Sequence, residues 1–256
     1  MRETALEQIR NEKSVARHIK IITRALACDE KFVFTRYSDG ELYMLFEKEI
    51  RLTGEGAWID GVKVNNQKYA EHDRKTYIPE RDSRIVKMLR QAYNYKSKRY
   101  LIGMPLNCCI GDDMYESLKQ KEGIPEIHTT ANLLINANYP YFITKTFKII
   151  KSKRIILVAN GRANIERIGN VIAFIKLGDD CGQQINKISE ELYNTINQYH
   201  NRENLLILCA ASYISNLLGY QIAEKYGDIT FLDIGTALHP LMGFEISRDY
   251  LYKYWS

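Results

Sequence analysis

The sequence predicts an α/β protein with a mostly parallel β-sheet flanked by helices in three layers. Residues 154–160 and 204–210 are continuous apolar runs of the kind that a parallel sheet buries on both faces. Strand-like segments alternate with amphipathic helix-like segments from residue 32 onward, which is the pattern of βαβ units. Several strand-like runs end at turns that contain glycine, and ligands of open α/β sheets bind at this carboxyl edge.

Composition limits the class of protein and of partner. The chain has 256 residues, of which 45% are hydrophobic and 26% are charged, as in an ordinary soluble globular protein. We expect a single domain over residues 1–256. The net charge of +5 suits an anionic ligand, such as a nucleotide diphosphate, or an anionic membrane surface. Basic and aromatic residues form no clustered stripe, so we expect no nucleic acid partner.

The amino-terminal residues and the cysteines indicate the cellular compartment. The start of the chain is charged and lacks the apolar core of a signal peptide, and no later window has the apolar length of a membrane span. The expected location is therefore the cytoplasm. A basic run at residues 145–154 is a solvated helix face or, alternatively, a contact with lipid head groups at the inner face of the membrane. Five cysteines without Cys-x-x-Cys spacing are expected to be reduced.

The first third of the chain predicts one helix, one strand and a long loop. Apolar residues at steps of three, four and seven predict a helix over residues 3–27. Residues 32–37 read as a short buried strand. From about residue 47 to residue 79 the periodicity is lost, and we expect an irregular loop region that carries function or covers the surface. Trp58 in this region is the kind of aromatic face that a sugar contacts.

The remaining elements follow the alternating pattern. Thr129 and Thr130 are expected to open a helix within residues 127–142, and Asp112 or Asp113 to cap another. Further helices are expected over residues 83–93, over 185–200 and from 212 to 227, and strands over 99–105, 154–160, 204–210 and 229–234, with a further apolar segment at 171–177.

Two carboxylates lie directly after the first strand. Asp39 and Glu41 flank Gly40 in residues 36–41, Arg-Tyr-Ser-Asp-Gly-Glu. Mg²⁺ and Mn²⁺ prefer oxygen ligands and take only one or two from the protein when they are held against phosphates, which Arg36 could also face. The alternative is structural, because Asp-Gly is a common turn and the helix dipole stabilises an acidic residue in a first helical turn.

A second turn offers a different phosphate contact. Asn160-Gly161-Arg162 follows the clearest strand and precedes a helix-like segment. A strand, a glycine turn and a helix start can cradle phosphate, with Asn160 in the turn and Arg162 as the charge partner. The full glycine fingerprint of dinucleotide-binding proteins is missing, so a dinucleotide is not expected.

Residues 36–41 resemble the Arg-Phe-Gly-Asp-Gly-Glu signature of the GT-D type bacterial glycosyltransferases, and residues 233–235 resemble their Asp-Ile-Gly segment. Segments between them fall in the same order, so the resemblance covers roughly residues 30–240. It implies a Rossmann-like fold. It also implies transfer of a sugar from a nucleotide-diphosphate donor, most simply a UDP-sugar, to a glycan or lipid-linked acceptor in cell-surface polysaccharide or glycoprotein biosynthesis.

The resemblance also implies roles for single residues. Asp39 and Glu41 would be the Asp-x-Glu pair that holds Mn²⁺ or Mg²⁺ and, through it, the donor diphosphate. Arg36 would be a cation facing the phosphates. Asp233 and Gly235 would shape the opposite wall of the donor site.

The sequence departs from the family after Asp-Ile-Gly. His239 lies in a segment where the family has other polar residues, and imidazole both binds Mn²⁺ and titrates near neutrality. The structural alternative is a histidine in a turn before proline. An inverting transfer needs a base for the acceptor hydroxyl, for which His72, Asp73 and His239 are the candidates. Ser38 stands where the family has glycine.

Two other classes of function stay open. A metal-dependent phosphodiester hydrolase could use the same two carboxylates, although the sequence shows no further acidic or histidine-rich cluster. A non-catalytic glycan-binding or polyanion-binding protein could use the basic surface and the 18 tyrosines. Those tyrosines are scattered through helices and strands, which is typical of core and rim residues.

Overall fold

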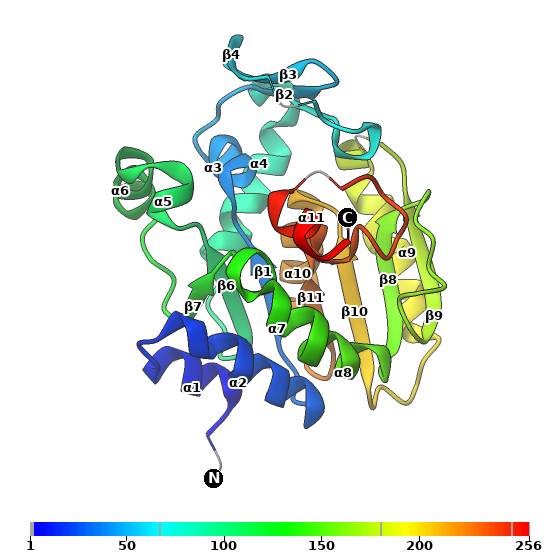
Figure 1. Ribbon diagram of the computed structural model, residues 1–256. Helices are drawn as coiled ribbons and strands as arrows, with labels where there is room; N and C mark the ends of the chain where they lie inside the picture. Colours follow the sequence, from blue (N-terminus) through cyan, green and yellow to red (C-terminus); the bar gives the residue numbers. More distant parts are fainter. Residues whose placement is uncertain (1–2, 67, 180, 247, 256) are drawn as a thin grey trace.

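The computed structural model describes residues 3–66, 68–179, 181–246 and 248–255. Its centre is a sheet of seven parallel strands in the order β7-β6-β1-β11-β10-β8-β9, counted over the described residues (Figure 1). The predicted α/β class and mostly parallel sheet are therefore confirmed. The strands are β1 (Val33–Arg36), β6 (Tyr100–Met104), β7 (His128–Thr130), β8 (Arg154–Asn160), β9 (Val171–Leu177), β10 (Leu205–Ala210) and β11 (Thr230–Asp233).

Alternate residues of the central strands enter two hydrophobic cores. In β8, Ile156 and Val158 face one core, whereas Ile155 and Leu157 face the other. Successive strand side chains point to opposite faces, so a strand that is apolar throughout fills both layers. One core is covered by α4 (Pro79–Tyr93), α9 (Ile185–Asn197) and α10 (Tyr213–Lys225), and the other by α1 (Ala5–Asn11), α2 (Val15–Ala27), α8 (Phe147–Lys151) and α11 (Asp249–Trp255).

The predicted single helix over residues 3–27 is wrong, because the chain forms α1 and α2 with a break between them. Glu12 is extended, with φ −87° and ψ 116°. Its carboxylate accepts a hydrogen bond from the backbone N–H of Ser14, and its carbonyl oxygen lies 3.0 Å from His18 Nε2. These local bonds compete with the helical ones and end α1. Most of the apolar stripe was predicted correctly, since Ile9 and Ile22 are buried, but Ala16 in the predicted stripe is exposed.

The expected irregular loop over residues 47–79 is also wrong, because this region contains a four-stranded antiparallel sheet in the order β4-β3-β2-β5. Asp60 and Gly61 both have positive φ, at 49° and 76°, and form the tight turn of a hairpin. The Asp-Gly dipeptide is a strong hairpin signal when strands flank it. The strands are β2 (Ile50–Thr53), β3 (Gly56–Ile59), β4 (Val62–Asn65) and β5 (Lys75–Tyr77), with the short helix η1 (Glu71–Asp73) before β5.

The threonine-capped helix expected within residues 127–142 is wrong as well. Thr129 and Thr130 belong to the edge strand β7, which pairs with β6. Buried Leu133 and Leu134 lie in the turns that follow, where the backbone N–H of Ala131 donates to Met104. An apolar run of this length does not distinguish a buried strand and turn from a helix. Helical structure resumes at η2 (Asn136–Asn138), α7 (Tyr139–Tyr141) and η3 (Phe142–Thr146).

Smaller differences concern helix ends. Gly111, and neither Asp112 nor Asp113, is the N-cap of α6. The helix from 212 ends at Lys225 with Tyr226 as its C-cap. Other helical elements are α3 (Asp39–Leu45), α5 (Asn107–Ile110), α6 (Asp112–Lys121), η4 (Cys181–Gln184) and η5 (Gly235–Leu238).

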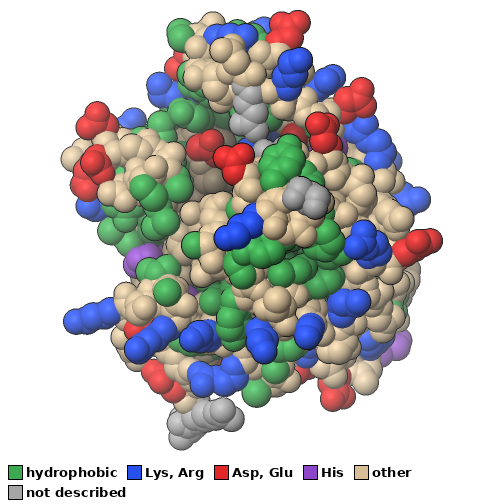
Figure 2. All heavy atoms as spheres, in the orientation of Figure 1, with side chains coloured by type: hydrophobic (Ala, Val, Ile, Leu, Met, Phe, Trp, Pro, Cys, Tyr) green, Lys and Arg blue, Asp and Glu red, His purple; other side chains and the backbone are tan. Residues whose placement is uncertain are grey.

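The basic run at residues 145–154 is not one continuous face. Lys145, Lys148 and Lys151 are exposed, but Lys153 is buried and donates to Asp29 and Asn204. Lys and Arg side chains are scattered over the lower part of the surface in Figure 2, with acidic side chains between them. Among the described helices, none combines the length and apolarity that crossing a membrane requires.

Candidate active site

A cavity of ≈ 580 Å³ lies at the carboxyl edge of the parallel sheet. The last residues of four strands contribute to its wall. They are Arg36 of β1, Asn160 of β8, Ala210 of β10 and Asp233 of β11. The small antiparallel sheet stands over this edge (Figure 1) and lines the cavity from the other side, together with the segment that follows β11. Parallel sheets bind ligands at this edge because strand ends, loops and helix starts converge there.

Arg36 and Asp233 form a largely buried ion pair in the wall of the cavity. Arg36 Nη2 lies 3.3 Å from Asp233 Oδ1, and their side chains are 13% and 3% exposed. The same carboxylate accepts from the backbone N–H groups of Arg36 and Gly235, at 3.2 and 3.0 Å. Burial raises the pKa of Asp233 above its usual value, and the Arg36 charge opposes that rise. Arg36 Nε is buried without a hydrogen-bond partner among the described residues, so it can still donate to a ligand.

Gly235 lets the guanidinium of Arg36 lie against the backbone. Its φ is +47°, and a Cβ atom at this position would clash with Arg36. Both features explain why glycine occupies the turn after β11. The glycine of the Asp-Ile-Gly segment therefore sets the position of the cation in the wall.

A left-handed backbone conformation costs a residue with a Cβ atom about 1–2 kcal/mol. Replacement of Gly235 with alanine is expected to lower the free energy of unfolding by more than this amount. The excess comes from moving Arg36 away from Asp233. Gly61→Ala is the matched control, because its φ is +76° and no atom lies within 4 Å of the added carbon. Urea unfolding of both variants measures the difference, and equal losses would contradict the assigned contact.

Asp39 and Glu41 lie in the first turn of α3 and both line the cavity. Asp39 is exposed, whereas Glu41 is only 5% exposed, so the two do not form a simple surface turn. Glu41 Oε2 accepts from the backbone N–H and the hydroxyl of Ser38, at 3.0 and 2.7 Å. Burial acts to raise the pKa of Glu41, but the Lys75 charge and the Ser38 hydrogen bonds outweigh it and lower the pKa. Glu41 is therefore an ionised, buried carboxylate.

These two carboxylates have the charge that suits a divalent cation, and both line the same cavity. A carboxylate has about four lone-pair sites, and Glu41 Oε1 has only a 3.4 Å contact with the Ser212 hydroxyl. Asp39, being exposed at the cavity, can supply a second oxygen. Lys75 is the competing cation, since its ammonium group donates to Ser212 Oγ at 2.7 Å and its charge acts on Glu41. A bound divalent ion would therefore move or replace the Lys75 contact.

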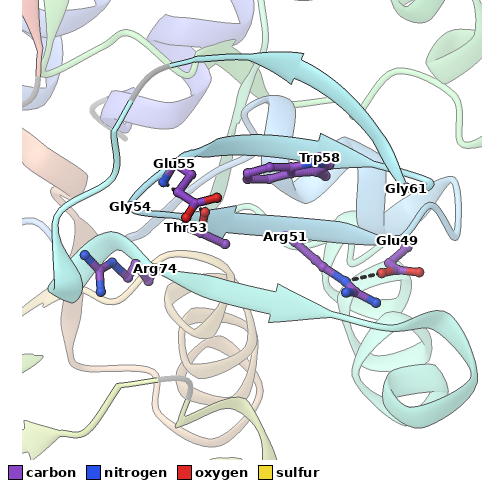
Figure 3. Close-up of a pocket in the computed structure, with 8 residues that line it drawn as sticks. All are labelled: Glu49, Arg51, Thr53, Gly54, Glu55, Trp58, Gly61 and Arg74. Atoms are coloured by element: carbon purple, nitrogen blue, oxygen red, sulfur yellow. Dashed lines mark hydrogen bonds and ion pairs between the residues drawn. The ribbon is translucent and has the colours of Figure 1, made fainter.

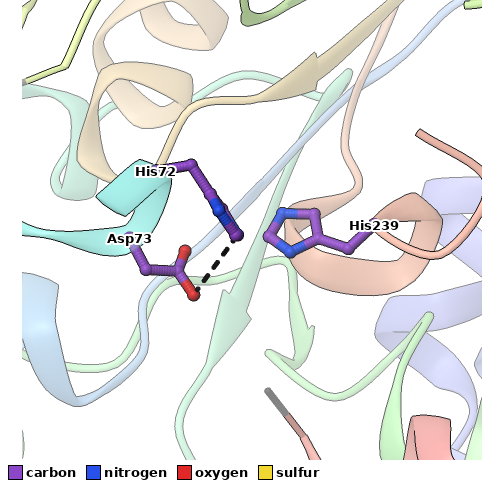
Figure 4. A group of neighbouring side chains, drawn as sticks. All are labelled: His72, Asp73 and His239. Atoms are coloured by element: carbon purple, nitrogen blue, oxygen red, sulfur yellow. Dashed lines mark ion pairs between the residues drawn. The ribbon is translucent and has the colours of Figure 1, made fainter. Parts of the chain in front are cut away.

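His72, Asp73 and His239 meet at another part of the same cavity (Figure 4). Their ligand atoms all lie within 4.8 Å of one another. His72 also stacks on Phe244, with ring centroids 4.4 Å apart and an interplanar angle of 20°. Burial lowers the pKa of His239 to about 4, although the Asp73 charge acts to raise it. The three residues predicted singly as acid, base or ligand are thus one cluster.

Asn160 and Arg162 are separated by the structure. Asn160 lines the cavity and donates to Asp179 at 2.9 Å. Arg162 is half-exposed, does not line the cavity, and pairs with Glu71 and Asp179 at 2.7 and 2.6 Å. Its charge is therefore balanced by neighbouring acids, and the predicted role of Arg162 as a phosphate partner has no geometric support.

Some functional candidates were not found from the sequence. Lys75 comes from β5, in the region expected to be a loop, and has no motif around it. Ser212 has φ +50°, a left-handed conformation that is uncommon outside glycine and tends to occur at functional sites. Arg248 and Tyr250 line the cavity from the carboxyl-terminal segment, where no motif marks them.

A second hollow of ≈ 860 Å³ lies on the small antiparallel sheet, where Trp58, Arg51 and Arg74 contribute side chains (Figure 3). Lys63 Nζ lies 5.2 Å from the centre of the Trp58 ring. Arg51 pairs with Glu49. Trp58 is thus on a different surface from the two carboxylates of α3, and the expected sugar contact of this residue is not in the cavity at the strand ends.

The fold is shared with solved structures of glycosyltransferases. One, described as a new glycosyltransferase (DUF1792) from Streptococcus sanguinis, has a TM-score of 0.58 and 14% identity, and the match covers 93% of this chain and 91% of that one. Another, described as a highly conserved domain of unknown function 1792 with a distinct glycosyltransferase fold, has a TM-score of 0.56 and 13% identity over 88% of this chain and 81% of that one.

The chain therefore has the glycosyltransferase fold of DUF1792 proteins. The resemblance to the GT-D type is confirmed at the level of the fold, because the match runs over nearly the whole chain. No family model matches the sequence, and no curated protein matches it either. Identity of 12–14% establishes the fold alone.

Proposed function

We propose that this protein is a metal-dependent glycosyltransferase that moves a sugar from a nucleotide-diphosphate donor to a glycan or lipid-linked acceptor. The observation that carries the proposal is the position of Asp39 and Glu41, which line one cavity together with Arg36 at the carboxyl edge of the sheet. This cavity combines acidic oxygens for a cation with a buried guanidinium for phosphate, on a fold shared with glycosyltransferases.

Different residues of the cavity are proposed to bind different parts of the donor. Asp39 and Glu41 would hold Mn²⁺ or Mg²⁺, which when bound would neutralise the charge that develops on the departing diphosphate. Arg36 donates to phosphate oxygens from a fixed position, because Asp233 and the backbone at Gly235 hold its guanidinium. His72, Asp73 and His239 line the same cavity and, while no metal occupies them, are the groups available to receive the proton of the acceptor hydroxyl.

Release of nucleotide diphosphate tests the reaction class. The protein is incubated with Mn²⁺ and with UDP-sugars, GDP-sugars, CDP-sugars or ADP-sugars. Each donor is tested with and without a mixture of oligosaccharide and lipid-linked oligosaccharide acceptors. We expect one nucleotide class to be released at a rate that rises when acceptor is present, because transfer consumes both substrates. Release that is equally fast without acceptor would indicate hydrolysis, and binding of a donor or a glycan without release would indicate a non-catalytic protein.

A further inference from the structure

The cluster of His72, Asp73 and His239 joins parts of the fold that are distant in sequence. His72 and Asp73 belong to η1, just before the last strand of the small sheet, and His239 follows β11 of the main sheet. Figure 4 shows the two imidazoles and the carboxylate pointing toward one another. Their nitrogen and oxygen atoms all lie within 4.8 Å. Two imidazoles and a carboxylate are a ligand set that first-row transition metals use in proteins.

Two nitrogen atoms in this cluster have no hydrogen-bond partner among the described residues. They are His72 Nε2 and His239 Nδ1, and both are buried. The side chain of His72 is 9% exposed, and His239 is 7% exposed. His72 Nε2 lies 3.9 Å from Asp73 Oδ2, which is too long for a hydrogen bond. A buried polar atom without a partner costs about 1–3 kcal/mol, so these nitrogens need another occupant of the space between them.

Neighbouring groups hold the two rings in place. Phe244 stacks on His72 and meets His239 edge to face, with ring centroids 5.2 Å apart. The carbonyl oxygen of His239 accepts from the backbone N–H groups of Met242 and Phe244, at 3.1 and 3.0 Å. The tight turn after β11 therefore fixes the direction of the His239 side chain. Ligands that are positioned by packing bind a metal with less loss of rotamer freedom.

The distances between the ligand atoms allow the three side chains to close around a cation. Ligand atoms at about 2.1 Å from a tetrahedral ion stand about 3.4 Å from one another. The atoms here lie within 4.8 Å, so they need to approach by roughly 1.4 Å at most. Rotation about the side-chain χ angles can close a gap of this size.

We propose that His72, Asp73 and His239 form a binding site for a first-row divalent transition metal, separate in its ligands from the Asp39 and Glu41 pair. Imidazole nitrogens favour ions such as Co²⁺ and Zn²⁺ and do not suit Mg²⁺, whereas an oxygen-only pair suits Mg²⁺ or Mn²⁺. Three protein ligands leave positions for water or for a ligand in the cavity. The proposal rests on the geometry of the cluster and does not require the transferase activity.

The site has a structural consequence for the small sheet. A metal bound by His72 and Asp73 on one side and by His239 on the other ties η1 to the segment after β11. This metal bridge would hold the small sheet against the edge of the main sheet beside the cavity. Because the metal binds the folded chain, it raises the temperature of unfolding by mass action.

The test uses the full chain after treatment with a chelator and without any nucleotide, so that it is independent of the proposed reaction. Calorimetric titration with Co²⁺, Zn²⁺, Mn²⁺ and Mg²⁺, each alone, measures affinity. We expect Co²⁺ and Zn²⁺ to bind and His72→Gln and His239→Gln to weaken that binding by about 100-fold or more. His128→Gln and His200→Gln are matched controls, since both histidines are exposed, and Asp39→Asn should leave this binding in place.

A spectroscopic measurement on the parent protein keeps the proposal testable if a variant fails to fold. Cu²⁺ prefers imidazole to carboxylate oxygens, so with one equivalent of Cu²⁺ bound, pulsed electron paramagnetic resonance should detect ¹⁴N of directly bound imidazole. Absence of nitrogen coupling, or Co²⁺ binding that is unchanged in both His72→Gln and His239→Gln, would overturn the proposal. Loss of Co²⁺ binding in Asp39→Asn alone would overturn it too, by placing the metal at the first turn of α3.

Discussion

Replacement of Asp233 with alanine is expected to lower the free energy of unfolding by about 3–5 kcal/mol, because it leaves a buried cation without its partner. The Asp233 carboxylate accepts from the Arg36 guanidinium and from two backbone N–H groups, and its side chain is only 3% exposed. The two backbone N–H groups cannot turn to water without distorting the end of β1 or the turn after β11. Chemical denaturation of the variant and the parent measures the loss.

The matched control is a second ion pair between arginine and aspartate at the surface. Arg202 Nη1 lies 2.9 Å from Asp228 Oδ1, and the Asp228 side chain is 58% exposed. Asp228→Ala should therefore cost less than about 1 kcal/mol, as exposed pairs generally do. If the two variants lose the same free energy, Asp233 does not balance a buried charge, and Arg36 is not held in the wall of the cavity as described.

Asp39→Asn and Glu41→Gln are each expected to slow release of nucleotide diphosphate from the donor sugar by about 100-fold or more, because each removes a cation ligand. Glutamine is preferred to alanine at position 41. The buried Glu41 carboxylate accepts two hydrogen bonds from Ser38, and removing the whole side chain would also cost stability. The glutamine side chain keeps an acceptor oxygen and the volume of the original.

The control for these variants is Asp113→Asn. Asp113 also lies in the first turn of a helix, is exposed, and is not in the wall of the cavity. It reports the effect of losing an acidic charge near a helix start without any effect on cation binding. A rate for Asp39→Asn or Glu41→Gln that matches the rate for Asp113→Asn would mean that the pair does not hold the catalytic cation.

The sequence predicted the parallel sheet because its signal is local. Residues 155–159 and 205–210 are apolar at every position, which is typical of strands that are buried on both faces. The small antiparallel sheet was missed because its strands have four residues or fewer, and β4 is exposed along its whole length. Such strands carry no hydrophobic period, so only the Asp60-Gly61 turn indicated them.

The candidate site was predictable only where a motif marks it. Asp39 and Glu41 were found because Asp-Gly-Glu follows a strand, but the burial of Glu41 depends on Lys75 and Ser212, which lie in other elements. His72 and His239 were considered singly, since nothing in the sequence relates residues so far apart. Their approach is a result of tertiary packing, in which the small sheet folds over the carboxyl edge of the main sheet.

Binding of UDP, measured by isothermal titration calorimetry with Mn²⁺ and again with excess chelator, tests the central claim most directly. UDP is the first of the four nucleotide diphosphates to be titrated, with GDP, CDP and ADP under the same conditions. We expect one of them to bind with Mn²⁺ and its affinity to fall at least about tenfold with chelator, since the cation would link Asp39 and Glu41 to the diphosphate. Equal affinity with and without Mn²⁺, or no binding of any of the four, would contradict a metal-dependent nucleotide-sugar transferase.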